Sequence, residues 1–455
     1  MSPVTAEPKR HRTLLLTLGL LTTITAVISS LGAPLIPAIA DTYDVAITDA
    51  QWALTAALLT AAVATPILGR LGAGQLRRQT IVVGLALVTI GAILSALPWG
   101  FAPLVVGRGL QGIGIALVPL ALAVARDAIA PPAISPAIAL LSVTAVAGAG
   151  LGFPLTAVIA QIWGLSATYW LGAILSATTL LMAWRFIPTG PPTIRLPVDW
   201  TGALLLSIGM GAALVSVSKG VGWGWGSTRT LVLGVTGIVL VAAWILWSLR
   251  RPHPLVDLRL ATHPGVAAPN LVAFGGGIGM YTLLTSAILL VQNPSWGLDG
   301  SISLAGMMLV PYSVMSVLGS RLALIAMARM GAKLLLPIGC LIFASATAGL
   351  AFAHDHIGWV LLWMGIGGIG GGFTFSSLAV LIVPHIPQAE TSSALAFNLV
   401  LRYLGFCVGS AVSVSLMSIY GGGDQGFTST LLTMSAVFGG VGGGAWSLAR
   451  RDTGR

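Results

Sequence analysis

The feature that most constrains this chain is a series of apolar runs, each about 20 residues long, that recurs along almost its whole length. A helix of that length crosses the hydrocarbon core of a bilayer, because each residue adds about 1.5 Å to a core about 30 Å thick. Hydrophobic residues make up 56% of the chain and charged residues only 7%. That share of charge is too small to cover a water-soluble protein, so the sequence predicts a multi-pass membrane protein.

The apolar runs predict an all-α fold of about fourteen transmembrane helices. The expected spans are 14–40, 50–69, 79–98, 104–125, 136–160, 166–186, 199–219, 229–249, 266–291, 302–327, 334–353, 358–383, 392–419 and 428–448. We expect residues 1–13 and 450–455 to be short tails, 14–186 and 266–449 to be six-helix halves, and 187–265 to hold an inserted helix pair with its linkers. Stretches 69–96 and 319–351 share one pattern, small residues followed by a basic loop and an apolar span, which predicts pseudo-symmetric halves.

The basic residues predict the orientation. Eighteen of the 22 fall in the two tails and in every second loop, as expected if both termini are cytoplasmic. They occur singly or in small groups rather than in a patch, so the net charge of +10 reflects topology and not nucleic-acid binding. We therefore expect a protein of the cytoplasmic (inner) membrane, with a composition that favours a bacterial source.

Four motifs follow one another in the expected order. GRLGAGQLRR (69–78) comes after the second span, and RGLQGIG (108–114) lies in the fourth. DWTGALLLSIGMGAALVSVSKGVGWGW (199–225) covers the first inserted span, and NLVLRYLGFCVGSAV (398–412) lies in the thirteenth. Together they resemble the major facilitator superfamily, and within it the fourteen-span branch of drug–proton antiporters. The resemblance implies a multidrug exporter in which conformational motifs control alternation. Their residues here are Gly69, Arg77, Arg78, Gly112, Gly114, Gly148, Gly152 and Pro154.

The chain also departs from that branch. Ala73 and Leu76 stand where the loop motif has an Asp and its second Gly, and stretch 22–39 has no Asp where the first span usually carries one. All 12 acids fall in loops or near span ends. A proton-coupled transporter normally needs a carboxylate or an imidazole within its cavity. The remaining candidates for a proton site are Asp41, Asp44 and Asp127.

The charges expected inside the membrane are positive. Arg108 shares a helix face with Gln111, and Arg402 shares one with Asn398. A buried arginine faces a cavity or a partner; the alternative is that each bonds backbone carbonyls or reaches the lipid headgroups. Other polar residues are candidates for the cavity lining, or alternatively for interhelical hydrogen bonds. These are Ser29, Ser30, Asn270, Tyr281, Thr285, Tyr312 and Asn398.

The surrounding Leu, Val, Ala and Gly predict a wide and mostly apolar pocket. We therefore expect a secondary exporter of lipophilic or amphipathic small molecules, surrounded by membrane lipids and with protons as coupling ion by resemblance. We expect no enzyme activity, cofactor, metal or nucleic acid, and a monomer suffices for the architecture. No Walker motif is present, so ATP is not the energy source.

Three alternatives remain: an uncoupled facilitator, a lipid or metabolite transporter, and a membrane scaffold or sensor that has lost transport. A membrane-embedded transferase is disfavoured, because the acids expected outside lie in short loops.

Overall fold

The computed structural model describes residues 6–72, 74–129, 131–190, 197–252, 254–255, 258–259, 264–331, 334–385 and 391–451. Within these ranges the side chains of 6–11, 26, 29–30, 131–140, 142–151, 221, 264, 379, 383, 391–393, 396 and 451 are not described.

The described part of the chain is helical and contains no strand. The α-helices are α1 (Ala6–Ser30), α2 (Ile36–Tyr43), α3 (Ile47–Ala50), α4 (Trp52–Leu71), α5 (Arg77–Ala96), α6 (Phe101–Ile115), α7 (Val118–Ala128), α8 (Pro131–Phe186), α9 (Trp200–Trp223), α10 (Thr228–Arg250), α11 (Pro264–Gln292), α12 (Ile302–Met330), α13 (Leu335–Phe352), α14 (Ile357–Ile382), α15 (Thr391–Ile419) and α16 (Gly423–Arg451). Short 3₁₀ turns are η2 (Ala33–Leu35), η3 (Gly74–Leu76) and η6 (Val383–His385).

The predicted spans correspond closely to these helices. Twelve helices among the described residues are long and apolar enough to cross a membrane. The predicted span 14–40 lies outside these twelve and falls on α1 with α2, and 136–160 overlaps one of them only from residue 152 onward; side chains are described only in part in both stretches. The outer surface is apolar as well, since Ile238 and Phe352 are 70% and 76% exposed. Such a surface is stable in lipid and not in water.

Two spans predicted as single helices are broken, and two predicted separately follow each other directly across a kink. The first span is interrupted at η2, whose Pro34 has no backbone N–H for a continuing helix. The fourth is divided into α6 and α7, with Pro119 in the first turn of α7. The fifth and sixth lie together in α8 as two helices that meet at a kink at Gly164. Its φ of 84° suits glycine, which has no Cβ to clash.

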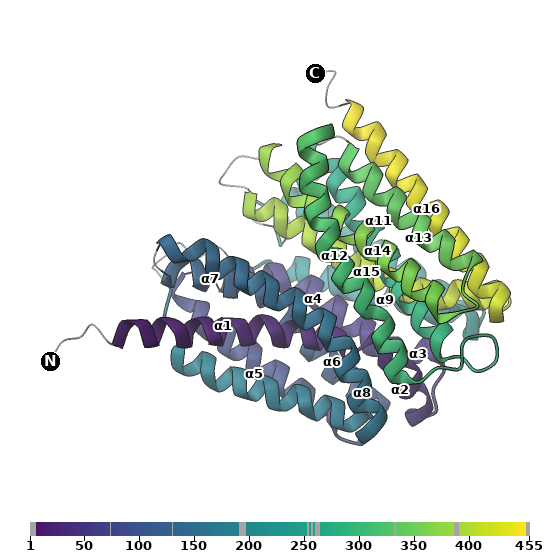
Figure 1. Cartoon of the computed structure of the whole chain (residues 1–455), viewed down its shortest axis with the longest axis horizontal. Coiled ribbons are helices and arrows are strands. Elements are labelled where there is room, and N and C mark those ends of the chain that lie inside the picture. The colour runs from purple at the N-terminus through teal and green to yellow at the C-terminus, as the bar shows by residue number, and fades with distance from the viewer. Residues whose placement is uncertain are drawn as a thin grey trace.

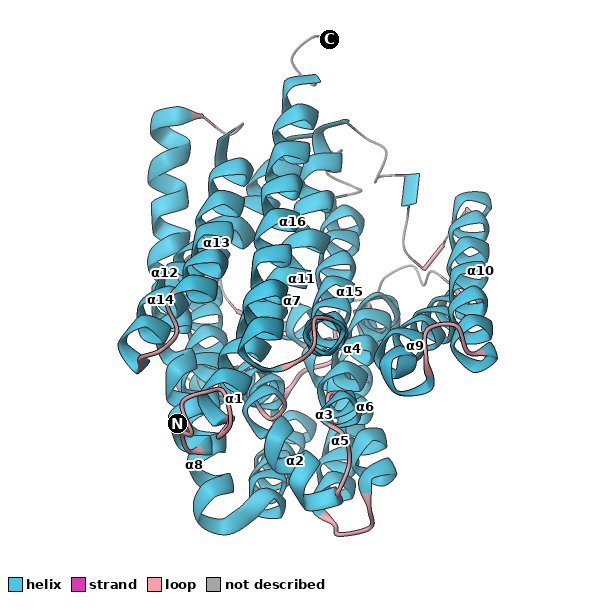
Figure 2. Ribbon diagram, turned by 90° about the vertical axis from the view of Figure 1, so that its right-hand side faces the viewer, coloured by secondary structure: helices cyan, strands magenta, loops and turns pink. Residues whose placement is uncertain are grey.

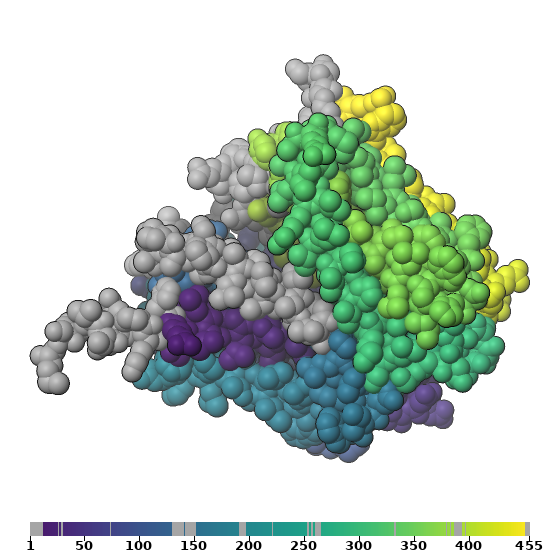
Figure 3. All heavy atoms as spheres, in the orientation of Figure 1, coloured from purple at the N-terminus to yellow at the C-terminus, as the bar shows by residue number. Residues whose placement is uncertain are grey.

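The long helices pack as two groups (Figure 1). The first helix group comprises α1 and α4 to α8, and the second comprises α11 to α16. The two groups meet where α8 packs against α12 and where α4 packs against α15. Figure 3 shows the first of these seams on the molecular surface, where the green α12 lies against the blue part of the chain. A core of buried apolar residues continues across the seams between the groups.

The inserted pair, α9 and α10, lies beside the α4–α15 seam. Helix α9 packs on α10, α15 and α4, and α10 lies on the outside (Figure 2). Trp52 Nε1 donates to Ser218 Oγ at 3.3 Å, and Ser415 Oγ donates to the Val217 carbonyl at 3.2 Å. Helix α9 is therefore hydrogen-bonded to both helix groups.

Asp199 stabilises the other end of the inserted pair. Its carboxylate accepts from the Gly202 N–H at 2.9 Å, which caps α9, and from Trp247 Nε1 at 3.0 Å and the Leu255 N–H at 3.1 Å. We expect Asp199→Ala to destabilise the protein by at least about 1 kcal/mol, because a lost helix cap alone costs that much. Melting of the purified protein in detergent measures the loss.

The control is Asp355→Ala, since Asp355 is exposed in a loop. Asp199→Asn keeps one carbonyl oxygen as an acceptor, so its melting temperature should lie between those of the wild type and Asp199→Ala. If Asp199→Ala has the same melting temperature as the Asp355→Ala control, the carboxylate of Asp199 does not stabilise the inserted pair.

Candidate functional site

The interior of the first helix group is built around Arg108, a residue of α6 that is completely buried. Its Nε donates to the Ala53 carbonyl at 2.8 Å. Its Nη1 donates to the Ile28 carbonyl at 3.2 Å and to Gln111 Oε1 at 2.7 Å. The guanidinium therefore spreads its charge over α1, α4 and α6. Nη2 is buried without a hydrogen-bond partner.

Gln111 extends this network to α5. Its Nε2 donates to Ser95 Oγ at 3.1 Å and to the Gly91 carbonyl at 3.3 Å. The three-residue spacing puts Arg108 and Gln111 on the same helix face. The two helices approach closely because Gly107 has no side chain, since a Cβ there would lie 2.4 Å from the Gly91 carbonyl oxygen.

The interior of the second helix group holds a polar pair between α11 and α15. Asn398 Nδ2 donates to Asn270 Oδ1 and to the Pro269 carbonyl, both at 3.1 Å. Both asparagines are buried, each with 6% of its surface exposed. Among the residues that the structure describes, Asn270 Nδ2 has no hydrogen-bond partner. The pair therefore retains a free donor inside the protein.

Arg402 lies on α15 one turn beyond Asn398, beside an aromatic cluster. Its guanidinium carbon is 5.4 Å from the centre of the Phe375 ring and 6.0 Å from that of Tyr403. We call Tyr281, Phe375, Tyr403 and Phe406 the aromatic cluster; Phe406 joins its members, with ring centres 4.6 Å from Tyr281, 6.2 Å from Phe375 and 5.8 Å from Tyr403. Arg402 is half-buried, and its Nε lacks a hydrogen-bond partner.

Polar contacts also join the two helix groups. Thr55 Oγ1 and Ser410 Oγ are 2.8 Å apart across the α4–α15 seam. At the α8–α12 seam the Ser303 N–H donates to Gln161 Oε1 at 3.1 Å. Gln292 Nε2 donates to the Pro34 carbonyl at 3.1 Å. Gln292 and Ser303 lie where α11 ends and α12 begins, and Gln161 lies three residues before the kink of α8 at Gly164.

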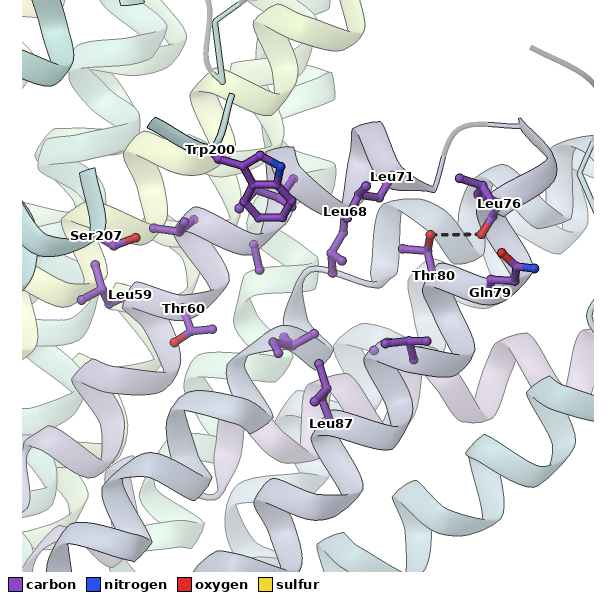
Figure 4. Close-up of a pocket in the computed structure, with 16 residues that line it drawn as sticks. Leu59, Thr60, Leu68, Leu71, Leu76, Gln79, Thr80, Leu87, Trp200 and Ser207 are labelled. Carbon is purple, nitrogen blue, oxygen red and sulfur yellow. Dashed lines mark hydrogen bonds between the residues drawn. The ribbon is translucent and has the colours of Figure 1, made fainter. Parts of the chain in front are cut away.

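A separate pocket of about 600 Å³ lies in the wall of the first helix group (Figure 4). Helices α4, α5, α6 and α9 form it, and Leu59, Val63, Leu68 and Leu87 are among its mostly apolar lining residues. Its polar lining side chains are Thr60, Gln79, Thr80 and Ser207, and Trp200 of α9 covers one side. Pockets of this size hold drug-sized molecules.

The basic loop motif lies at one end of the first helix group, and its Leu71 and Leu76 line this pocket. Arg77 forms an ion pair with Asp127 at the end of α7, and Arg78 donates to the Trp184 carbonyl of α8. Arg70 donates to the Pro197 carbonyl at 2.8 Å, which links α4 to the segment before α9. The loop therefore stays attached to the helix ends around it, although Ala73 lies outside the described residues.

Most of the predicted cavity residues lie in the interior, divided between the two helix groups. Buried side chains are Arg108, Gln111, Asn270, Tyr281, Thr285, Tyr312 and Asn398, and Arg402 is half-buried. Arg108 and Gln111 belong to the first helix group and the other six to the second. None of them lines the pocket of Figure 4. The side chains of Ser29 and Ser30 lie outside the described part.

The predicted conformational motifs lie at packing seams and at helix ends. Gly112 and Gly114 are buried in α6, Gly152 and Pro154 lie in the part of α8 that faces α12, and Gly69 is exposed near the end of α4. Gly148 lies outside the described side chains. Of the candidates for a proton site, Asp41 and Asp44 are exposed at the end of α2, and Asp127 is the partner of Arg77.

Sequence inspection missed the seam residues and the pocket. Thr55, Ser410 and the pocket-lining Thr60 and Ser207 are short polar residues in apolar runs, a pattern that also fits simple packing. Phe375 and Phe406 gave no signal, because a single Phe in a membrane span is ordinary. Among the described residues, no group of three or more His, Cys, Asp or Glu side chains could hold a metal ion.

Comparisons with known proteins agree with this architecture. Over residues 18–410 the sequence matches the family model of the Major Facilitator Superfamily. It is similar to the multidrug resistance protein Stp of Mycobacterium tuberculosis, 25% identical over 76% of this chain and 64% of Stp, so it spans less than two thirds of Stp. It is also similar to the fatty acid resistance protein FarB of Neisseria gonorrhoeae, 25% identical over 88% of this chain and 80% of FarB.

Among solved structures, a POT family transporter in complex with 5-aminolevulinic acid has the same fold. It superimposes with a TM-score of 0.68 at 15% identity and covers 96% of both chains. A family match that runs through both helix groups, together with this fold, decides the assignment: the chain belongs to the Major Facilitator Superfamily.

Proposed function

We propose that this protein is a secondary exporter of lipophilic or amphipathic small molecules and works by alternating access. In this proposal the first and second helix groups are the pseudo-symmetric N-terminal and C-terminal halves, and α9 and α10 are the inserted pair. The observation that carries it is the placement of polar side chains. Arg108 and Arg402 lie inside two helix groups whose outer faces are apolar. In this proposal the polar part of a cargo therefore crosses the membrane through the protein interior.

The seams support the alternation. Among the described residues, four hydrogen bonds and close helix packing join the groups; two of the bonds involve Thr55, one Gln292 and one Ser303. The hydrogen bonds involve neutral groups, each worth about 0.6 kcal/mol on average between membrane helices. Few and weak contacts of this kind can break and re-form during a transport cycle. Rocking of the two halves about such seams would expose the interior to each side of the membrane in turn.

The cargo class follows from the surroundings of the polar groups. Both the pocket in Figure 4 and the aromatic cluster favour apolar molecules with few polar groups. Stp is named for multidrug resistance and FarB for fatty acid resistance. We extend that class of cargo to this chain, with both termini in the cytoplasm of a bacterial cell and export as the direction of transport.

A proteoliposome assay tests the exporter. The full chain is reconstituted, a lipophilic dye is added, and its movement is followed with and without an imposed pH gradient. Movement that follows the gradient and stops with an uncoupler supports a proton-coupled exporter. Absence of any protein-dependent movement across a panel of lipophilic compounds contradicts transport and favours the scaffold alternative.

A second candidate function is uncoupled, facilitated transport of the same compounds. The observation that favours it is the lack of an acidic group in the interior: among the described side chains, every Asp and Glu is exposed or only partly buried. A transporter without an embedded carboxylate has no obvious site for a coupling proton. Dye movement that continues unchanged when the pH gradient is removed selects the facilitator.

The pocket of Figure 4 gives a further prediction. Val63→Trp puts a large ring into this pocket, which Val63 of α4 lines. If cargo reaches the interior from the membrane through this pocket, dye transport by Val63→Trp falls several-fold at unchanged protein abundance. Initial rates in proteoliposomes give the measurement.

The matched control is Val235→Trp, which makes the same substitution on the outer face of α10, where Val235 is 59% exposed. We expect this variant to transport like the wild type. Equal rates for the two variants would mean that the pocket is no part of the cargo's route.

A further inference from the structure

We propose that the interior of the second helix group binds the carboxylate head of an amphipathic acid, with Arg402 and Asn270 as the donors. The proposal rests on the transport function above and names the chemical class of its cargo. In this proposal the carboxylate of the cargo supplies the negative charge that the interior lacks.

The first step is the charge balance of the interior. Arg108 is buried and Arg402 half-buried, whereas no Asp or Glu among the described side chains is buried. The ion pairs found in the described part join Arg77 to Asp127, Lys219 to Asp49 and His354 to Asp424, all at helix ends. A positive charge inside a membrane protein is costly unless it is paired or dispersed. The interior therefore favours an anion and disfavours a cation.

The second step distinguishes the two arginines. Arg108 disperses its charge through three hydrogen bonds to fixed oxygens, on Ala53, Ile28 and Gln111. Arg402 instead lies beside the rings of Phe375 and Tyr403, and its Nε is buried without a hydrogen-bond partner. Aromatic faces stabilise a cation without using every N–H group. Among the described residues, Arg402 therefore keeps its Nε as a donor for a ligand. Arg108 also has one unpartnered donor, Nη2, but its three hydrogen bonds fix the guanidinium to α1, α4 and α6.

The third step is a second free donor, on Asn270, the hydrogen-bond partner of Asn398. Asn398 uses Nδ2 for two hydrogen bonds, to the Pro269 carbonyl and to Asn270 Oδ1. Because the Pro269 carbonyl can only accept, it fixes Asn398 Nδ2 as a donor, and so Asn270 must present its oxygen there. The Asn270 amide nitrogen is left buried with no acceptor. Since Asn398 and Arg402 are one helical turn apart, both free donors lie in the same region between α11 and α15.

The fourth step selects a carboxylate with an apolar tail. A buried donor without an acceptor costs free energy, and an anionic oxygen is the acceptor that relieves it best. A guanidinium fits the two oxygens of a carboxylate in a fixed geometry. The aromatic cluster next to Arg402 offers apolar surface for the rest of the molecule. Ligands with several charges would lose too much hydration in such surroundings.

The test uses three amphiphiles with the same chain length: dodecanoate, dodecan-1-ol and dodecyltrimethylammonium. Binding to the purified full chain in nanodiscs is measured by quenching of tryptophan fluorescence. For the wild type we expect dodecanoate to bind at least about tenfold more tightly than the alcohol, as a hydrogen-bonded charge provides. The ammonium compound should bind most weakly.

The variants Arg402→Gln and Asn270→Ala should each lower the preference for dodecanoate over dodecan-1-ol toward unity. This affinity ratio does not depend on the fraction of folded protein, and melting curves show whether each variant folds. Arg321→Gln is the matched control, because Arg321 is exposed on α12, and it should keep the wild-type ratio. An unchanged ratio in Arg402→Gln overturns the proposal, and so does tighter binding of the ammonium compound by the wild type.

The outcome separates this inference from the exporter itself. A chain that transports a neutral lipophilic dye but shows no preference for dodecanoate is an exporter without this anion site. A chain that prefers dodecanoate through Arg402 but moves no compound in proteoliposomes has the site without the transport function.

Discussion

Replacing Arg108 with alanine is expected to abolish transport and to lower the free energy of unfolding by roughly 3 kcal/mol or more. The side chain is completely buried, so its removal leaves a cavity, which alone costs a few kcal/mol for a large residue. It also removes the hydrogen bonds that tie α6 to α1 and α4, through Ile28 and Ala53. Melting of the purified protein and transport normalised to protein abundance measure the two effects.

Arg108→Met separates packing from hydrogen bonding. Methionine refills most of the volume without a charge, so part of the lost stability should return while transport stays low. Arg108→Lys should also fail, because one ammonium cannot reach three acceptors in the directions that the guanidinium uses. Wild-type transport by Arg108→Met would show that the residue only fills space.

The second large effect is expected for Gly112→Ala. A Cβ on Gly112 would lie 2.1 Å from the Ala57 carbonyl oxygen of α4, a backbone atom that cannot move without its helix. We expect the added methyl group to push α4 and α6 apart, at a cost of about 1–3 kcal/mol, as for other overpacked sites. Transport should fall with it, because the hydrogen bond from Arg108 to the Ala53 carbonyl crosses the same interface.

The matched control is Gly439→Ala in α16, where a Cβ meets no atom within 4 Å. That substitution should leave stability unchanged or raise it by up to about 1 kcal/mol, because alanine favours a helix over glycine. The difference in melting temperature between the two variants is the measurement. If they melt alike, close approach of α4 and α6 is not what Gly112 provides.

Much of the fold could be predicted from local patterns. The apolar runs predicted α10 as 229–249 and α12 as 302–327, and the structure has them at Thr228–Arg250 and Ile302–Met330. Length and hydropathy suffice here because a span in lipid must be apolar and must satisfy its own backbone hydrogen bonds. The breaks at η2 and before α7 were missed, although Pro34 and Pro119 stand at them, because a proline within a membrane helix need not end it.

The candidate site was predictable in composition but not in arrangement. The three-residue spacing of Arg108 and Gln111 predicted a shared face, and the two side chains are hydrogen-bonded. For Asn270 and Asn398 the sequence left cavity lining and interhelical bonding open, and the structure pairs the two with each other. The sequence could not have identified Asn398 as the partner of Asn270, because the two residues are 128 positions apart in the chain. The pocket beside Trp200 was not predicted at all, since its walls come from α4, α5, α6 and α9.

By itself the sequence determined that this protein lives in lipid, roughly where each helix begins and ends, and that its buried charges are positive. These properties depend on neighbours along the chain, because each span in lipid must be apolar and must satisfy its own backbone hydrogen bonds. Only the tertiary structure decided which oxygens surround Arg108, which amide of the asparagine pair stays free, and where the helix walls leave a pocket. Those features arise between helices that are distant in the chain, and glycines such as Gly107 and Gly112 set how closely the backbones approach.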